Sequence, residues 1–206
     1  GDQLWDVPTI IAPRSLTVSN GRVYLWDGVT SLMAIDTADG ATAWKGEAGI
    51  QLFEGRAAAS QPPVASENGI AAVSGNRVIV LFDPDGNWIT NIGNFDPFTV
   101  EMALADPSTL IFAGNGKVNW ESEVEPYERQ LVSVDLATGS INWQTDYNAL
   151  VTGLTVTDTM ALVLADNPGL AIREVQLVDA EGTVTTEQTN PYPAQTSPQI
   201  FGYFLD

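Results

Sequence analysis

The sequence predicts an all-β fold: a β-propeller of four-stranded antiparallel blades, with about four blades plus partial blades, and therefore an incomplete ring. Three observations predict it. A tight turn recurs along the chain, strand-like segments surround each copy of the turn, and a tryptophan follows the turn at a fixed distance. No segment shows a convincing helical period, whereas Val and Thr are abundant and Gly is frequent.

The recurring turn starts with an aspartate and ends with a glycine. Its copies are Asp36–Gly40, Asp83–Gly86, Asp135–Gly139 and Asp179–Gly182, and their first residues are 47, 52 and 44 positions apart. A four-stranded propeller blade takes roughly 40–50 residues, so this period fits one blade. Glycine adopts the positive φ that such a turn needs, and aspartate can bond the backbone of its own turn.

Strand-like segments lie on both sides of each turn. An alternating or apolar strand precedes the turn, and a further pair of strands joined by a short turn lies upstream. The strands before the turns are Ser31–Ile35, Arg77–Phe82, Gln130–Val134 and Arg173–Val178, and the upstream pairs are Thr17–Trp26, Val64–Val73, Ala103–Phe112 and Leu154–Leu164.

A tryptophan follows the turn glycine by four residues in two repeats, as Trp44 and Trp143. Trp5 keeps the same distance from the first residue, also a glycine, so we expect the chain to begin inside a blade. Trp88 is out of step, only two residues after its glycine, and Thr186 stands at the position in the fourth repeat. These large rings are expected to fill the space between neighbouring sheets as core residues rather than to hold a cofactor.

The repeat resembles that of the quinoprotein-like (PQQ-type repeat) β-propeller family. The best match is Gly21–Leu25 with Leu32–Asp36, Gly40 and Trp44, and Leu131–Trp143 is the next best. The resemblance identifies the fold but not an activity, because the family includes many members that are not enzymes. In the family's quinone dehydrogenases a vicinal Cys pair, a calcium cluster and a catalytic Asp mark the site, and this chain has no Cys.

The expected blade repeats are approximately 8–47, 60–92, 99–146 and 150–188, with a partial blade at 196–206, so that residues 1–206 form one partial propeller. An open propeller leaves unpaired edges and bare sheet faces. We therefore expect either that this chain is part of a larger propeller or that copies associate through the open ends.

The charge balance is strongly acidic, with 26 Asp and Glu against 8 Lys and Arg and a net charge of −18. Such a surface repels nucleic acid and anionic lipid, and no apolar run is long enough for membrane insertion. One interpretation of this acidic surface is that it keeps the protein soluble. The other is that it captures cations or a basic partner. The chain has no Cys and no His, which removes thiolate nucleophiles and the Ser-His-Asp triad.

The longest departure from the repeat is the loop 114–129, which projects from one face of the third blade and offers a possible interaction site. Its alternative is a solvated hairpin extension whose tryptophan packs onto its own blade. The aromatic and acidic residues of the possible interaction loop are Trp120, Glu121, Glu123, Glu125, Tyr127 and Glu128.

Asp83, Asp85 and Asn87 alternate as the ligands of a calcium loop do, but no later Glu stands in register, and a hairpin turn is the alternative. Asp39 and Asp179 are likewise expected to form turns. We therefore expect no catalytic residue, no metal site and no cofactor.

These features favour a non-catalytic binding or scaffold propeller that mediates contact with a protein or ligand. We expect this module to be extracytoplasmic, meaning periplasmic, secreted or cell-surface. One alternative is a fragment of a dehydrogenase that depends on pyrroloquinoline quinone and calcium. Another is the sensor domain of a membrane-attached protein.

Overall fold

The computed structural model describes residues 4–8, 16–26, 31–47, 62–74, 78–92, 101–115, 129–147, 150–157, 160–167 and 172–191. These residues form strands and turns without a helix, so none of them forms an apolar helix that could cross a membrane. The expected partial blade at 196–206 lies outside the described residues.

Four antiparallel four-stranded sheets make up the fold. In each sheet, strands that follow one another along the chain are also neighbours. The strands are β1 Leu16–Ser19, β2 Arg22–Trp26, β3 Ser31–Asp36, β4 Thr42–Glu47, β5 Val64–Ala65, β6 Ile70–Ser74, β7 Val78–Phe82, β8 Trp88–Ile92, β9 Glu101–Asp106, β10 Thr109–Asn115, β11 Arg129–Asp135, β12 Ile141–Tyr147, β13 Leu150–Val156, β14 Met160–Asn167, β15 Ile172–Asp179 and β16 Val184–Pro191.

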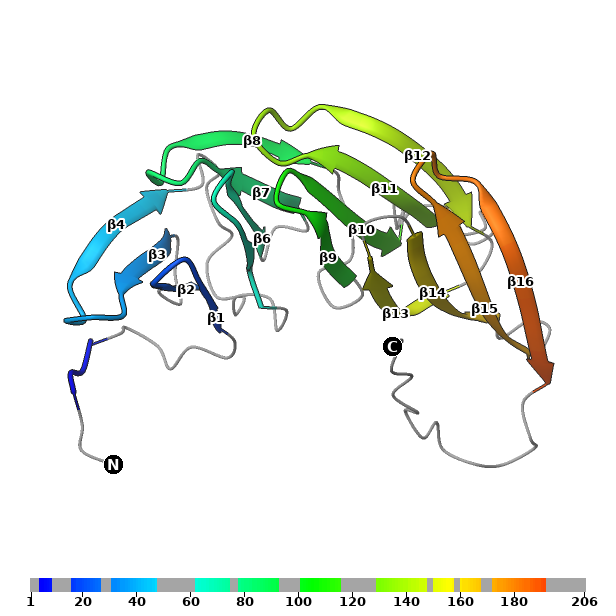
Figure 1. Cartoon of the computed structure of the whole chain (residues 1–206), viewed down its shortest axis with the longest axis horizontal. Helices are drawn as coiled ribbons and strands as arrows, with labels where there is room; N and C mark the ends of the chain where they lie inside the picture. The colour runs from blue at the N-terminus through cyan, green and yellow to red at the C-terminus, as the bar shows by residue number, and fades with distance from the viewer. Residues whose placement is uncertain are drawn as a thin grey trace, which may run out of the picture.

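The four sheets follow one another around an arc that does not close (Figure 1). The last strand of each sheet, β4, β8, β12 or β16, lies on the convex outer side of the arc. This arrangement confirms the predicted propeller of four-stranded blades with an incomplete ring. We call the sheets blades A to D in chain order.

The turn that predicted the repeat joins the third and fourth strands of every blade. Its glycines Gly40, Gly86, Gly139 and Gly182 all have positive φ, between 74° and 87°. The Asn20-Gly21 turn between β1 and β2 has positive φ at both residues, 48° and 72°. These values explain why glycine and asparagine occur at these places.

Each outer strand carries a β-bulge close to its start. In blade A the pairing shifts between Ala34 and Ile35, which pair with Trp44 and Thr42 and leave Ala43 out of the ladder. The same shift occurs in the other three blades. A bulge inserts one residue and turns the strand, so the residues two and four positions after the turn glycine sit on opposite faces of the blade.

The residue four positions after the turn glycine packs onto the turn of the next blade. A Cβ atom on Gly86 would lie 2.5 Å from the Trp44 ring, and one on Gly182 would lie 2.7 Å from the Trp143 ring. The two indole Nε1 groups donate hydrogen bonds to main-chain carbonyls of these turns, to Pro84 at 2.9 Å and to Ala180 at 2.6 Å. Glycine is required here because any side chain would displace the indole.

Trp5 makes the same contact with blade A. Its ring lies so close over Gly40 that a Cβ atom on this glycine would be 2.7 Å from it, and its Nε1 donates to the Thr37 carbonyl at 3.0 Å. Exposure alternates along Leu4–Pro8, with Trp5 and Val7 facing the blade. This segment therefore occupies the place that an outer strand takes at the other junctions.

The junction between blades B and C differs from the expectation. Thr90 of β8 takes the tryptophan position and packs on Gly139, while Trp88 starts β8 on the solvent side and is 49% exposed. Trp88 is therefore not a core residue. At this junction the fully buried Leu136 packs instead, with its Cγ 3.2 Å from a Cβ position on Gly69.

Apolar side chains fill each junction between blades. Tyr24 and Trp26 of blade A pack against Ile70 and Phe82 of blade B. Blades B and C share a second cluster, which includes Leu81 and Phe112, and blades C and D share a third. Because each sheet buries its faces against its neighbours, stability comes from contacts between adjacent blades.

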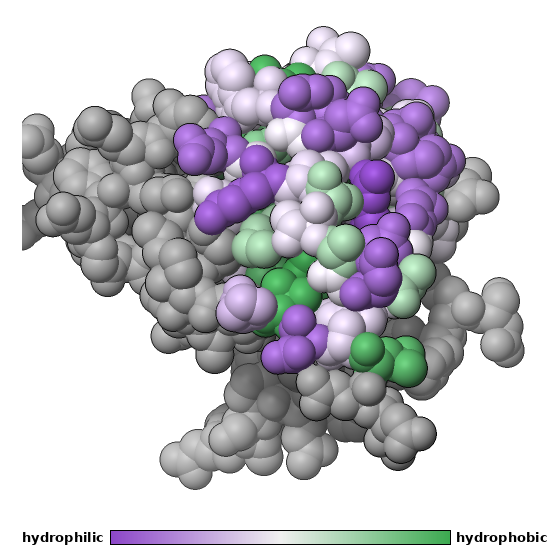
Figure 2. All heavy atoms as spheres, turned by 90° about the vertical axis from the view of Figure 1, so that its left-hand side faces the viewer, coloured by the Kyte–Doolittle hydropathy of each residue, from purple (hydrophilic) through white to green (hydrophobic). Residues whose placement is uncertain are grey.

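Blade A has one face that points away from blade B, and among the described residues no sheet packs against this face. Leu25, Met33 and Ile35 of this face are covered by Trp5 and Val7 of the N-terminal segment. Val18 of β1, the strand of blade A farthest from the outer strand β4, is 62% exposed. Figure 2 looks onto this side of the molecule and shows apolar surface between polar residues.

Replacing Gly86 by Ala tests the contact between blades, with Gly21→Ala as the matched control. Both residues have positive φ, so each substitution costs about 1–2 kcal/mol of unfolding free energy from backbone strain. Only at Gly86 does the new methyl group collide with a tryptophan, which adds about 1–3 kcal/mol. Chemical denaturation measures both changes, and equal losses would show that the indole contact contributes nothing.

Candidate functional site

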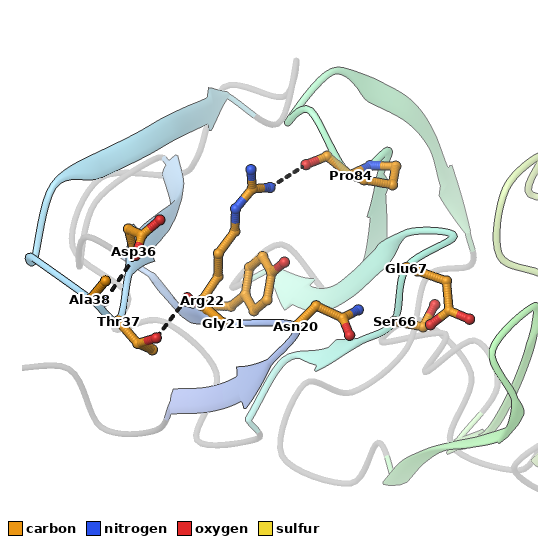
Figure 3. Close-up of a pocket in the computed structure, with 10 residues that line it drawn as sticks. Asn20, Gly21, Arg22, Asp36, Thr37, Ala38, Ser66, Glu67 and Pro84 are labelled. Carbon is orange, nitrogen blue, oxygen red and sulfur yellow. Dashed lines mark hydrogen bonds between the residues drawn. The ribbon is translucent and has the colours of Figure 1, made fainter.

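A groove of about 530 Å³ opens between blades A and B, at the end of the blades where the turns lie (Figure 3). Residues of both blades line it, so its shape depends on how the two blades pack. The lining residues are Asn20, Gly21, Arg22, Tyr24, Asp36, Thr37, Ala38, Ser66, Glu67 and Pro84.

Arg22 crosses the groove from blade A to blade B. Its Nη1 donates a hydrogen bond of 2.9 Å to the Pro84 carbonyl, which also accepts from the indole of Trp44. The buried Tyr24 lies beneath, with its ring 6.0 Å from that of Trp44. A guanidinium has five N–H donors, so Arg22 can link the blades and still present donors to a ligand.

The blade A side of the groove is a rigid turn. Thr37 donates to the Gly21 carbonyl from both its backbone N–H and its hydroxyl, each at 2.9 Å. Asp36 accepts a hydrogen bond from the Ala38 N–H at 2.8 Å. These bonds hold the exposed Ala38 at the mouth of the groove.

The blade B side is fixed through its contact with blade C. The buried Ser66 hydroxyl donates to the Pro107 carbonyl at 2.6 Å and accepts from the Asn68 N–H at 3.1 Å. Asn68 also donates to the Ser108 hydroxyl at 2.8 Å. The turn that carries the exposed Glu67 is therefore anchored on both sides, and its carboxylate stands at the groove with little backbone freedom.

The groove depends on which side chains meet at the junction. In the strand ladder of blade A, Arg22 stands opposite the turn aspartate Asp36. Thr109 has the same place opposite Asp135 in blade C, where a smaller pocket of about 210 Å³ opens toward blade D. In blade B the corresponding residue is Gly69, against which Leu136 packs. The larger groove exists where the first blade offers a long polar side chain and the next offers Pro84.

The loop that the sequence singled out, with Trp120, Glu121, Glu123, Glu125, Tyr127 and Glu128, lies outside the described residues, and its role stays a prediction. The sequence did not indicate the groove. Arg22 and Glu67 each stand at a turn of the repeat, but only the packing of blade A against blade B brings both to one groove.

The carboxylate of Asp83 serves its own turn. It accepts from the backbone N–H groups of Asp85 at 3.0 Å and Asn87 at 2.8 Å, and from the Asn87 side chain at 2.8 Å. Burial alone would raise the pKa of Asp83, but these hydrogen bonds hold it below its ordinary value. The pKa of Asp106 is also lowered, chiefly by the N–H of Ser108.

Comparison with protein families gives a match over residues 1–181 to the PQQ-like repeat family model described as outer membrane protein assembly factor BamB. The chain belongs to this family. The match covers blades A to C and the first three strands of blade D, so it confirms the resemblance seen in the repeat. Comparison with curated protein sequences gives no match.

Solved structures share the propeller fold. A europium-containing methanol dehydrogenase has a TM-score of 0.62 and 13% identity, over 87% of this chain and 42% of that one. Quinohemoprotein alcohol dehydrogenase from Comamonas testosteroni has a TM-score of 0.54 and 12% identity, over 84% and 34%. The chain thus spans less than half of either dehydrogenase.

The computationally designed Ika4 protein has a TM-score of 0.57 and 12% identity, over 90% of this chain and 96% of that one. At such identities these likenesses show the fold alone.

Asp83→Ala tests the role of this carboxylate, with Asp85→Ala as the control in the same turn. We expect Asp83→Ala to lower the unfolding free energy by about 1–2 kcal/mol at neutral pH, because several hydrogen bonds are lost. Asp85→Ala should change it by no more than about 0.5 kcal/mol.

The effect depends on pH. Because the pKa of Asp83 is lowered in the folded state, its contribution is complete above the ordinary Asp pKa and is lost as the pH falls through the lowered value. Denaturation series at several pH values should show the two variants converging in acid. A constant difference would mean that the ionised carboxylate is not responsible.

Proposed function

We propose that this propeller is a non-catalytic, extracytoplasmic binding module, and that the groove between blades A and B holds a segment of a partner protein. The groove itself is the observation that carries the proposal. It combines a guanidinium, carboxylates and backbone groups around an aromatic floor, a composition suited to an extended peptide.

The family supports this proposal. Its model carries the description of an outer membrane protein assembly factor, which fits a role in binding other proteins. Propeller families of this kind are typically extracytoplasmic, which supports the same place for this chain. Fixed turns at the groove favour binding, because little conformational entropy is lost when a partner is held.

A quinone-dependent dehydrogenase is the second candidate, since solved dehydrogenases share the fold. Among the residues that the structure describes, no three acidic side chains come together to hold a metal ion. A quinone absorbance band after incubation with pyrroloquinoline quinone and calcium would favour the enzyme over the binding module.

The groove is tested by a photo-crosslinking residue at Ala38, with Ala137 as the control. Both alanines are exposed and occupy the same place in the repeated turn, but Ala38 lines the groove, whereas Ala137 does not line the smaller pocket between blades C and D. In cells that produce the protein, we expect the probe at Ala38 to yield at least about five times more crosslinked protein. Ala38→Trp should block crosslinking from a probe at Glu67, whereas Ala137→Trp should not. Equal yields from both probes would contradict the proposal.

We further propose that copies of this chain associate through the open face of blade A. Val18 is exposed there beside a covered apolar cluster. Light scattering of the whole chain in moderate salt should give a mass above that of the monomer, and Val18→Asp should return it to the monomer. Ala137→Asp, at an exposed turn, serves as the control. A wild-type chain that stays monomeric at all salt concentrations would refute this association.

A further inference from the structure

An apolar residue is exposed at the same place in three consecutive blades. Trp88, Ile141 and Val184 are the first residues of β8, β12 and β16, and each stands two positions after its turn glycine. They are 49%, 55% and 40% exposed. In blade A the polar Thr42 takes this place. We call Trp88, Ile141 and Val184 the rim stripe.

The bulge in each outer strand explains why these side chains are exposed, whereas the residue two positions later in β8 or β12 packs on the next blade. Trp88 pairs with the buried Phe82, and the ladder then skips Ile89 before it resumes at Thr90. Ile141 and Val184 are placed by the same shift in their blades. The repeat therefore presents one residue per blade at the outer rim, and three successive blades use an apolar residue there.

Trp88 is the largest member of the stripe and is held in place. Its Nε1 donates a hydrogen bond of 3.0 Å to the Asn91 side-chain oxygen on the same strand. The polar atom of the indole is thereby satisfied while about half of the side chain remains open to solvent. A tryptophan in this state provides contact area at low entropic cost, as interface hot spots do.

The position of the stripe indicates how a partner lies. The three residues belong to three different outer strands on the convex side of the arc (Figure 1). A strand added to one blade edge would pair with one outer strand only. A partner that contacts all three residues must run around the rim, across the strands.

The charges beside the stripe indicate the chemistry of this partner. Exposed carboxylates of Asp85 and Glu181 each stand three residues before a stripe residue, in a chain with a net charge of −18. We propose that the rim stripe docks a cationic amphipathic helix of a partner protein, with apolar residues on the stripe and basic residues on the turns. This surface is distinct from the groove and goes beyond the proposed function. The exposed carboxylates of Asp85 and Glu181 disfavour an anionic membrane at this surface, and they disfavour the stripe of a second copy, which carries the same charges.

The probe is an 18-residue Leu/Lys peptide with leucines on one helical face, compared with a scrambled peptide of the same composition. Fluorescence anisotropy measures its binding to the whole chain at low and moderate salt. We expect the triple variant Trp88→Ser, Ile141→Ser, Val184→Ser to bind at least about tenfold more weakly. Leu4→Ser, which removes an apolar residue that is 86% exposed outside the stripe, should bind as the wild type does.

Each other outcome overturns the proposal. Equal binding of both peptides, or of the triple variant and the wild type, would mean charge attraction alone. No binding of the helical peptide at low salt would exclude a helix dock. Light scattering and flotation with phosphatidylcholine vesicles test the other occupants: self-association or vesicle binding that only the triple variant loses would assign the stripe to a second copy or to lipid. Unchanged circular dichroism and thermal unfolding confirm that the variant folds.

Discussion

The structure depends on one contact that is repeated from blade to blade. The outer strand of each blade places a side chain on the turn glycine of the next, and at three places this side chain is a tryptophan that also bonds the turn backbone. The contact sets the distance between sheets, and the apolar clusters fill the space that it defines. The same turns line the groove and directly precede the residues of the rim stripe. The positions of both candidate surfaces are therefore set by the way the blades pack.

Much of the fold was predictable because its signals are local. A glycine at positive φ and an alternating strand are properties of short segments, so the turns and strands of every described blade could be located from the residues. Trp88 shows the limit. Its spacing suggested an irregular repeat, but the bulge keeps the register and gives its expected place to Thr90. The sequence shows that Thr90 stands four residues after Gly86, but it does not show that this spacing, rather than the presence of a ring, decides which side chain reaches the next blade.

The groove was not predictable for a related reason. Arg22 and Pro84 are 62 residues apart, and their contact follows only when two sheets are placed side by side. The residues that decide whether a junction is open, Arg22 or Gly69 on one side and Pro84 or Leu136 on the other, look ordinary one at a time. Whether a junction is open depends on two residues from adjacent blades, and the sequence of one repeat contains only one of them.

The fit of Leu136 against Gly69 has a consequence for how the chain reaches this state. Similar repeats can pair in the wrong order during folding, and such misassembly is a known hazard of repeat proteins. Leu136 needs a neighbour without a side chain at the facing position, and Gly69 is that neighbour, whereas Arg22 and Thr109 are not. A blade C that paired with blade A would meet a guanidinium where it requires empty space. Sequence differences among the repeats therefore favour the packing of each blade against its correct neighbour.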